Sequence, residues 1–108
     1  MRFQTYEQFW PFYLHEHRNR RTRQLHLLGT ALGLALCAGA AVIGDWRLLL
    51  AGIVTGYGFA WVAHALIERN RPATFTHPLW SLTSDFRMLA LFVTGRLDGE
   101  LKKHGLDV

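Results

Sequence analysis

Two long apolar stretches with a three-residue break between them constrain this chain more than any other feature. Residues 27–44 carry no charge, and residues 48–67 carry one histidine but no acid, lysine or arginine. As α-helices rising about 1.5 Å per residue, each stretch would span roughly 27–30 Å, close to the hydrocarbon thickness of a bilayer. The break, Asp45-Trp46-Arg47, is too short for a further element. The pattern therefore predicts a transmembrane helical hairpin with spans at about residues 26–44 and 48–67.

Glycines recur on both predicted helices with the spacing that allows close helix packing. Gly29 and Gly33 are four residues apart, as are Gly52 and Gly56. Small residues at this spacing let the backbones of two membrane helices approach closely. The same glycines could also join copies of the chain into a homo-oligomer. A buried hairpin in a soluble protein is the alternative interpretation, because an 18-residue stretch is near the lower limit for a membrane span.

Arginines flank the hairpin asymmetrically. Four of them lie between Arg18 and Arg23, before the first span, and Arg69 and Arg71 follow the second, whereas only Arg47 lies in the connecting turn. Positive charge gathers on the cytoplasmic side of membrane proteins. We therefore expect an integral membrane protein, of the inner membrane in a bacterium, with both termini in the cytoplasm. Nucleic acid is not an expected partner so close to a span.

Helical segments are also predicted on either side of the hairpin. Residues 3–18 are rich in aromatic side chains, which are typical of a helix lying at a membrane interface. Asn19 is a suitable end for that helix, and Thr22 could cap the next one.

The C-terminal region predicts a further helix at about residues 78–97. This segment is apolar but is interrupted by Asp85 and Arg87, so it is an interfacial or re-entrant helix, or a third span. The predicted fold is a single all-α membrane domain, residues 1–108, with a transmembrane hairpin and interfacial or re-entrant helices around it.

Histidines are the strongest indication of chemistry. In a hairpin that turns near Asp45, residue 26 lies level with about residue 65 of the second helix, so His26 and His64 are expected at nearly the same depth. His17 lies nine residues before His26, which places the two on opposite sides of a continuous helix. They can meet only if the chain turns between them, and the segment 19–22 could provide that turn.

Two further residues could join this group. His77 follows a proline-containing turn on the same side of the membrane, and Glu68 shares a helix face with His64. Imidazoles with a carboxylate and without thiolates suit iron, zinc or another first-row metal. Cys37 is the only cysteine, which excludes a thiolate cage. In the alternative interpretation, His64 only forms a hydrogen bond within the hairpin.

Several motifs resemble those of one family. The first is Tyr13-x3-His17-x-Asn19-x6-His26. The second is Trp61-x2-His64-x3-Glu68-x-Asn70-x-Pro72-Ala73-Thr74-Phe75, followed by His77-Pro78 and Ser81-Leu82-x2-Asp85-Phe86-x-Met88. Over roughly residues 6–95 the chain resembles the small membrane proteins related to the fungal 2-hydroxy fatty acid dioxygenase of phytosphingosine breakdown. The last motif is more similar to the short bacterial branch.

This resemblance implies an Fe(II)-dependent enzyme that uses molecular oxygen to shorten a 2-hydroxy fatty acid by one carbon. It implies His17, His26 and His64 as iron ligands, with His77 as the fourth ligand and Glu68 nearby. The basic side chains of Arg18, Arg20 or Arg71 could then neutralise the substrate carboxylate. Two alternatives stay open: a zinc-dependent lipid hydrolase with Glu68 as catalytic base, and a membrane scaffold protein without catalytic activity.

Overall fold

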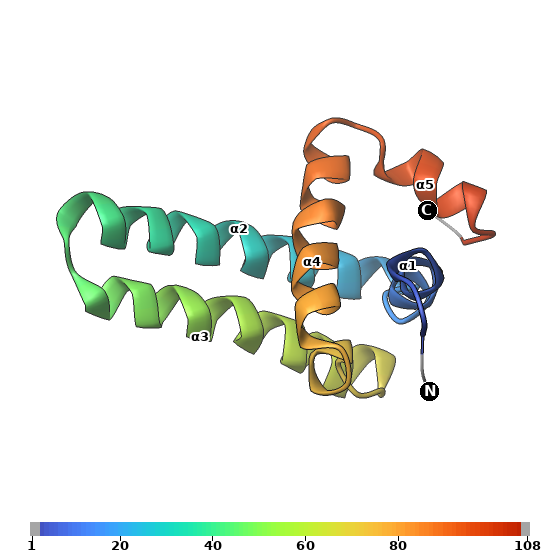
Figure 1. The fold of residues 1–108 in the computed structure, drawn as a ribbon, viewed down its shortest axis with the longest axis horizontal. Helices are drawn as coiled ribbons and strands as arrows, with labels where there is room; N and C mark the ends of the chain where they lie inside the picture. Colours follow the sequence, from blue (N-terminus) through green and yellow to red (C-terminus); the bar gives the residue numbers. More distant parts are fainter. Residues whose placement is uncertain (1–2, 107–108) are drawn as a thin grey trace.

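The chain is an all-α protein, as predicted. The structure is a computed structural model that describes residues 3–106, and within them the chain forms five α-helices and two short helical turns (Figure 1). The elements, in order, are α1 (Tyr6–His15), α2 (Arg20–Ile43), α3 (Trp46–Ala63), the π-helical turn η1 (His64–Glu68), the 3-10 turn η2 (Ala73–Phe75), α4 (Pro78–Val93) and α5 (Leu97–Lys103).

Helices α2 and α3 form the predicted hairpin and run side by side for most of its length (Figure 1). The connection is tight because Gly44 takes a left-handed conformation (φ 78°) and the Asp45 side chain accepts a hydrogen bond from the backbone N–H of Arg47. A Cβ at Gly33 would lie 2.9 Å from the backbone oxygen of Gly52, and one at Gly52 would lie 2.7 Å from the backbone oxygen of Gly33. The two glycines are therefore required for the close helix contact.

The outer surface of the hairpin is apolar. Both segments, Arg20–Ile43 and Trp46–Glu68, are long and apolar enough to cross a membrane, and most of each is not buried by the rest of the described chain. Val42, Leu50 and Val54 are more than half exposed. Contiguous apolar surface of this kind is unusual on a soluble monomer. The two long helices therefore suggest membrane association.

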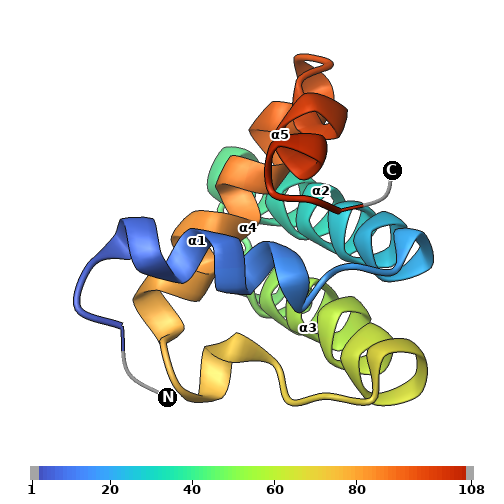
Figure 2. The same ribbon diagram turned by 90° about the vertical axis from the view of Figure 1, so that its right-hand side faces the viewer.

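The remaining helices gather at the open end of the hairpin, where they form the hydrophobic core. Figure 2 shows α1 lying across this end, with α4 beside it and α5 packed against α4. The buried core side chains come mainly from α1, α4 and α5: Phe9, Trp10, Tyr13, Leu14, Met88, Leu97 and Leu101. Helix α4 runs across the hairpin instead of along it (Figure 1). Helix α4 is therefore not parallel to the hairpin, as a third span would be.

Two predictions at the N-terminal end were wrong in detail. The first helix ends at His15 and begins at Tyr6, so it is shorter than the predicted 3–18. Asn19 begins α2: its side chain accepts a hydrogen bond from the backbone N–H of Arg21, so Asn19 and not Thr22 is the N-cap. Both residue types can cap a helix, and the hydrogen bond from the backbone N–H of Asn19 to the Glu68 carboxylate favours a helix start at residue 19. The predicted turn between His17 and His26 is present, but earlier than residues 19–22.

Candidate metal centre

Three histidines from three separate parts of the chain meet at the open end of the hairpin. His17 lies in the turn after α1, His26 lies on α2, and His64 is the first residue of η1. One ring nitrogen from each can be chosen so that the three atoms lie within 4.8 Å of one another. All three side chains are buried, with 1%, 5% and 1% of their surfaces exposed. His26 and His64, which the sequence placed at nearly the same depth, thus lie in one cluster, and the turn after α1 adds His17 to them.

Local backbone geometry holds His17 and His64 in place. After α1 the chain changes direction within a few residues, because Asn19 begins a new helix, and this brings His17 beside His26 of α2. His64 opens a π-helical turn that ends at Glu68 and is followed by Arg69, a left-handed residue with φ 58°. The backbone N–H of Asn70 then donates to the carbonyl of His64, which brings the Asn70 side chain back beside the imidazole. Single π-helical turns are frequent at functional sites.

The rings of His17 and His64 point their Nε2 lone pairs at each other. His17 Nδ1 lies 2.7 Å from the carbonyl oxygen of Tyr13, which can only accept, so this nitrogen carries the proton. His64 Nδ1 donates in the same way to Oδ1 of Asn70, at 2.7 Å. Burial, followed by the charges of the other two histidines, lowers the pKa of His17 well below its usual value, so its ring stays neutral. When both rings are neutral, two acceptor nitrogens therefore face each other at 3.1 Å.

His26 presents a third nitrogen without a partner. Its Nε2 lies 3.3 Å from Oδ1 of Asp85, which favours a proton on Nε2, and its Nδ1 is buried with no hydrogen-bond partner. The Tyr13 hydroxyl donates to the same carboxylate oxygen at 2.6 Å. Burial and Asp85 raise the pKa of Tyr13 well above its usual value, so the hydroxyl keeps its proton. Burial also raises the pKa of Asp85 to about 7, although the hydrogen bond from Tyr13 acts in the opposite direction.

A cluster of three buried imidazoles, with two Nε2 atoms facing each other, is an arrangement that a metal ion satisfies. A buried acceptor without a partner is costly, and two facing acceptors repel each other unless a cation lies between them. Neutral imidazole is a ligand for iron, zinc, copper and nickel, so the residues fit a first-row metal. The second nitrogen of each ring meets an oxygen atom, as the outer partners of metal-bound histidines generally do. The buried cluster is therefore a candidate metal site.

His77 lies outside this cluster. Its ring stacks on Trp80 with an interplanar angle of 2° and packs against Phe9, and its Nδ1 forms a hydrogen bond with the Thr76 hydroxyl at 2.9 Å. These contacts place His77 in the aromatic packing between α1 and α4. They give no support to the prediction that His77 is a fourth ligand.

Glu68 and the arginines also have other contacts. Glu68 accepts a hydrogen bond from the backbone N–H of Asn19 at 2.7 Å, so its carboxylate joins η1 to the start of α2. Arg18 lies 4.0 Å from the same carboxylate. Arg71 lies over the ring of Phe75, and Arg20 lines a surface depression with Asp98. Arg18, Arg20 and Arg71 are all exposed.

Asp85, Tyr13 and Asn70 are the functional candidates that reasoning from histidine spacing missed. Each lies beside one of the three histidines and orients it through a side-chain or backbone oxygen. The signal was available in the sequence, because all three residues occur in the motifs that carry the family resemblance. Spacing alone could not show that α4 brings Asp85 to α2.

Comparison with known proteins assigns the family. A family model described as 2-hydroxy-palmitic acid dioxygenase Mpo1-like matches residues 3–97. The chain therefore belongs to this Mpo1-like family, and the match extends over α1, the hairpin and α4 and includes all three clustered histidines. Neither a curated protein nor a solved structure matches the chain.

Proposed function

We propose that this protein is a metal-dependent dioxygenase that shortens 2-hydroxy fatty acids by one carbon at a membrane surface. The family is the first support for this proposal. The observation that carries it is the pair of buried Nε2 atoms of His17 and His64, which face each other at 3.1 Å with both Nδ1 protons directed elsewhere. We propose His17, His26 and His64 as the ligands of Fe(II).

The chemistry divides between the metal and the protein. Bound Fe(II) would supply the activation of molecular oxygen. Asp85, whose Oδ1 lies 3.3 Å from Nε2 of His26, would hold the His26 ring, and Tyr13 would in turn hold Asp85. Asn70 would hold the His64 ring through the hydrogen bond at Nδ1. The Asn70 side chain is itself held in place, because its amide N–H₂ donates to the carbonyl oxygen of Glu16 at 3.4 Å. The predicted role of Arg18, Arg20 or Arg71 as carboxylate partner stays a prediction.

We further propose that the hairpin crosses the membrane with both ends of the chain in the cytoplasm. The exposed apolar surfaces of α2 and α3 support the crossing, and the arginines that flank the hairpin support the orientation. The metal site would then lie just inside the cytoplasmic surface, where a 2-hydroxy fatty acid in the bilayer presents its polar end.

The test is metal content and activity of anaerobically purified protein in detergent. We expect about one iron per chain after reconstitution with Fe(II), lost in His26→Ala and His64→Ala. His15→Ala, an exposed histidine on α1, is the matched control and should keep its iron. His77→Ala tests the fourth-ligand prediction directly: retained iron would remove His77 from the ligand set.

Oxygen uptake with a 2-hydroxy fatty acid then tests the reaction. Uptake and a shortened product in the wild type, both absent in His64→Ala, would support the proposal. Folded protein that binds Fe(II) without consuming oxygen on any 2-hydroxy acyl substrate would refute it. Activity on a lipid ester with bound zinc, without oxygen, would favour the hydrolase alternative.

A further inference from the structure

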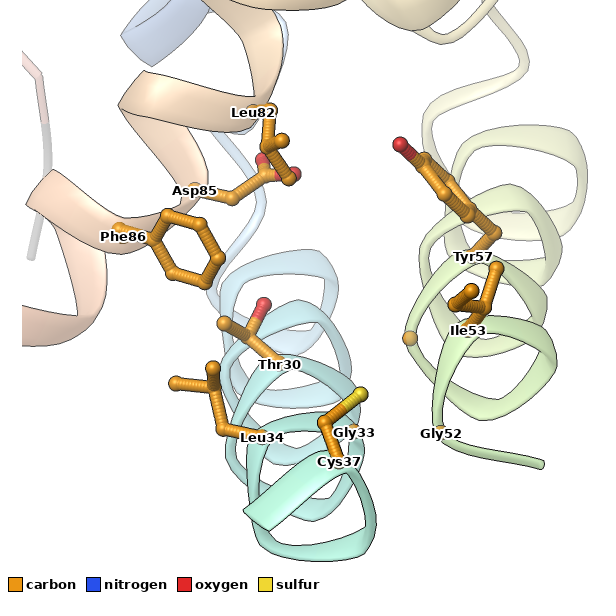
Figure 3. A pocket seen from close by; sticks show the side chains of 11 residues that line it. Thr30, Gly33, Leu34, Cys37, Gly52, Ile53, Tyr57, Leu82, Asp85 and Phe86 are labelled. Atoms are coloured by element: carbon orange, nitrogen blue, oxygen red, sulfur yellow. The ribbon is translucent and has the colours of Figure 1, made fainter. Parts of the chain in front are cut away.

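An apolar cleft lies between the hairpin and α4. It has a volume of about 140 Å³, and its walls come from α2, α3 and α4. Figure 3 shows the side chains that line it. Leu34 and Cys37 form the α2 wall, Ile53 lies on α3, and Leu82 and Phe86 project from α4. The cleft thus runs beside the part of the hairpin that is proposed to cross the membrane.

The cleft reaches a residue beside the candidate metal centre. Asp85 lines the end of the cleft nearest the histidines, its inner end, and Oδ1 of the same residue lies 3.3 Å from Nε2 of His26. Figure 3 shows the hydroxyl groups of Thr30 and Tyr57 in the same close-up as the Asp85 carboxylate, whereas Cys37 lies further along α2. Residues 30–37 rise about 10 Å along the helix. The cleft therefore leads from polar groups beside the histidines to an apolar region nearer the hairpin turn.

The glycines in the wall do not all have the same role. Gly33 and Gly52 are required for the helix contact, because a Cβ on either would lie within 3 Å of the partner's backbone. At Gly56, by contrast, the nearest atom to an added Cβ is the backbone oxygen of Gly29, at an ordinary contact distance of 3.8 Å. Packing between the helices therefore does not require glycine at position 56. What the missing side chain provides there is space in the cleft.

We infer that this cleft binds the acyl chain of the substrate, and that Gly56 determines whether the chain fits. The inference rests on the proposed function. An acyl chain matches the apolar walls, and its polar end would meet the polar inner end beside His26. Because Leu34, Ile53 and Phe86 of the lining are each more than 40% exposed, the chain would move in from the surrounding lipid. A larger side chain at position 56 would occupy the volume that the chain needs.

Photolabelling of the metal-free protein tests the inference without catalysis. The probe is a saturated long-chain fatty acid that lacks the 2-hydroxyl and carries a diazirine. With the diazirine at mid-chain, we expect crosslinks near Cys37 and Ile53. With the diazirine close to the carboxyl group, we expect them to move toward Tyr57 and Asp85. An excess of unlabelled 2-hydroxy fatty acid should displace both.

Two matched variants make the test specific. Gly56→Leu should reduce labelling about tenfold or more, because overfilling a packed site by several carbons typically costs at least this much in affinity. Gly58→Leu is the control, because it lies on the same helix with open space around its Cβ but borders a different depression, with Leu25 and Val62. It should label like the wild type. Gly56→Ala adds a single methyl group and should give a smaller loss if the leucine variant does not fold.

The outcomes separate this inference from the proposed function. Labelling that is confined to the cleft and displaced by the 2-hydroxy fatty acid, without any oxygen uptake, would support acyl-chain binding in the cleft and refute only the proposed reaction. Labelling spread evenly over the exposed faces of α2 and α3, and equal in the Gly56→Leu and Gly58→Leu proteins, would overturn the inference even if the protein proves to be an iron dioxygenase. In an active enzyme, Gly56→Leu should impair long-chain substrates more than short ones.

Discussion

The two ends of the hairpin differ in which side chains they bury and which they expose. Along the hairpin, Gly33 and Gly52 face the partner helix, and toward the turn the large apolar side chains, such as Val42 and Ile43, face outward. At the open end, large aromatic side chains such as Phe9 and Tyr13 are fully buried, and most charged side chains, apart from Arg23 and Asp85, lie outside. The first arrangement suits a lipid environment and the second suits water. The three histidines lie at the boundary between them, where a buried polar cluster can be enclosed by protein and still be reached from lipid.

The largest expected effect comes from a charged side chain introduced on the outward face of the hairpin. Val54→Lys places an ammonium at a position that is 63% exposed in the middle of α3. In water this change would be nearly neutral, whereas in lipid it should cost about 2.5–3.5 kcal/mol. We expect a much smaller membrane-inserted fraction in a membrane-extraction assay. Glu7→Lys, an exposed change on α1, is the control. Equal insertion of both variants would mean that the hairpin does not cross the bilayer.

A second test breaks the glycine contact. Gly33→Leu should destabilise the protein by about 1–3 kcal/mol or more, because its Cβ would meet the backbone oxygen of Gly52 at 2.9 Å. Gly58→Leu has no atom within 4 Å of its Cβ and should change stability little. Thermal unfolding in detergent measures both variants. Equal melting temperatures would contradict the close helix contact.

A third test changes the residues beside the three histidines, at the boundary between the two regions. Asp85→Asn should weaken metal binding about 10–100-fold, because it removes the carboxylate beside His26 while leaving all three histidines in place. Tyr13→Phe should have a smaller effect in the same direction, since it removes only the hydrogen bond to Asp85. Competition with a chelator measures both affinities. Asp98→Asn, on α5, is the control and should bind metal normally.

The smallest expected effect is a pH dependence of the open end. A hydrogen bond from Trp10, followed by the nearby charges of Lys103, His104 and Arg87, holds the pKa of Glu100 below its usual value of 4.5, against the effect of burial. A lowered folded-state pKa stabilises the protein above the unfolded value and loses this contribution as pH falls through the folded value. Melting temperature should therefore fall slightly as the pH drops below about 4.5.

Trp10→Phe isolates this effect. It removes the N–H that donates to Glu100 at 2.8 Å but keeps an aromatic ring in the core. We expect a flatter dependence of melting temperature on pH than in the wild type. An unchanged slope would show that Glu100 does not contribute through this bond.

Some features of the fold and the site could be predicted before the structure was known. Long uncharged stretches with a three-residue break leave little alternative to a hairpin, because its register follows from helix rise alone. That register placed His26 and His64 at one depth, and the nine-residue separation of His17 from His26 required a turn. The positions of caps were harder to predict, since Asn19 and Thr22 are both suitable residues and tertiary contacts such as Glu68 with Asn19 favour one of them.

What the sequence by itself determined is the hairpin, the depth of its histidines and the imidazole chemistry of the site. Those features depend on composition and helical periodicity, which are local properties of the chain. Only the tertiary structure decided which groups surround the cluster. Helix α4 crosses the hairpin and brings Asp85 to His26, whereas His77 is held by stacking on Trp80 and Glu68 by the start of α2. Those partners depend on contacts between residues far apart in the chain, which no local spacing specifies.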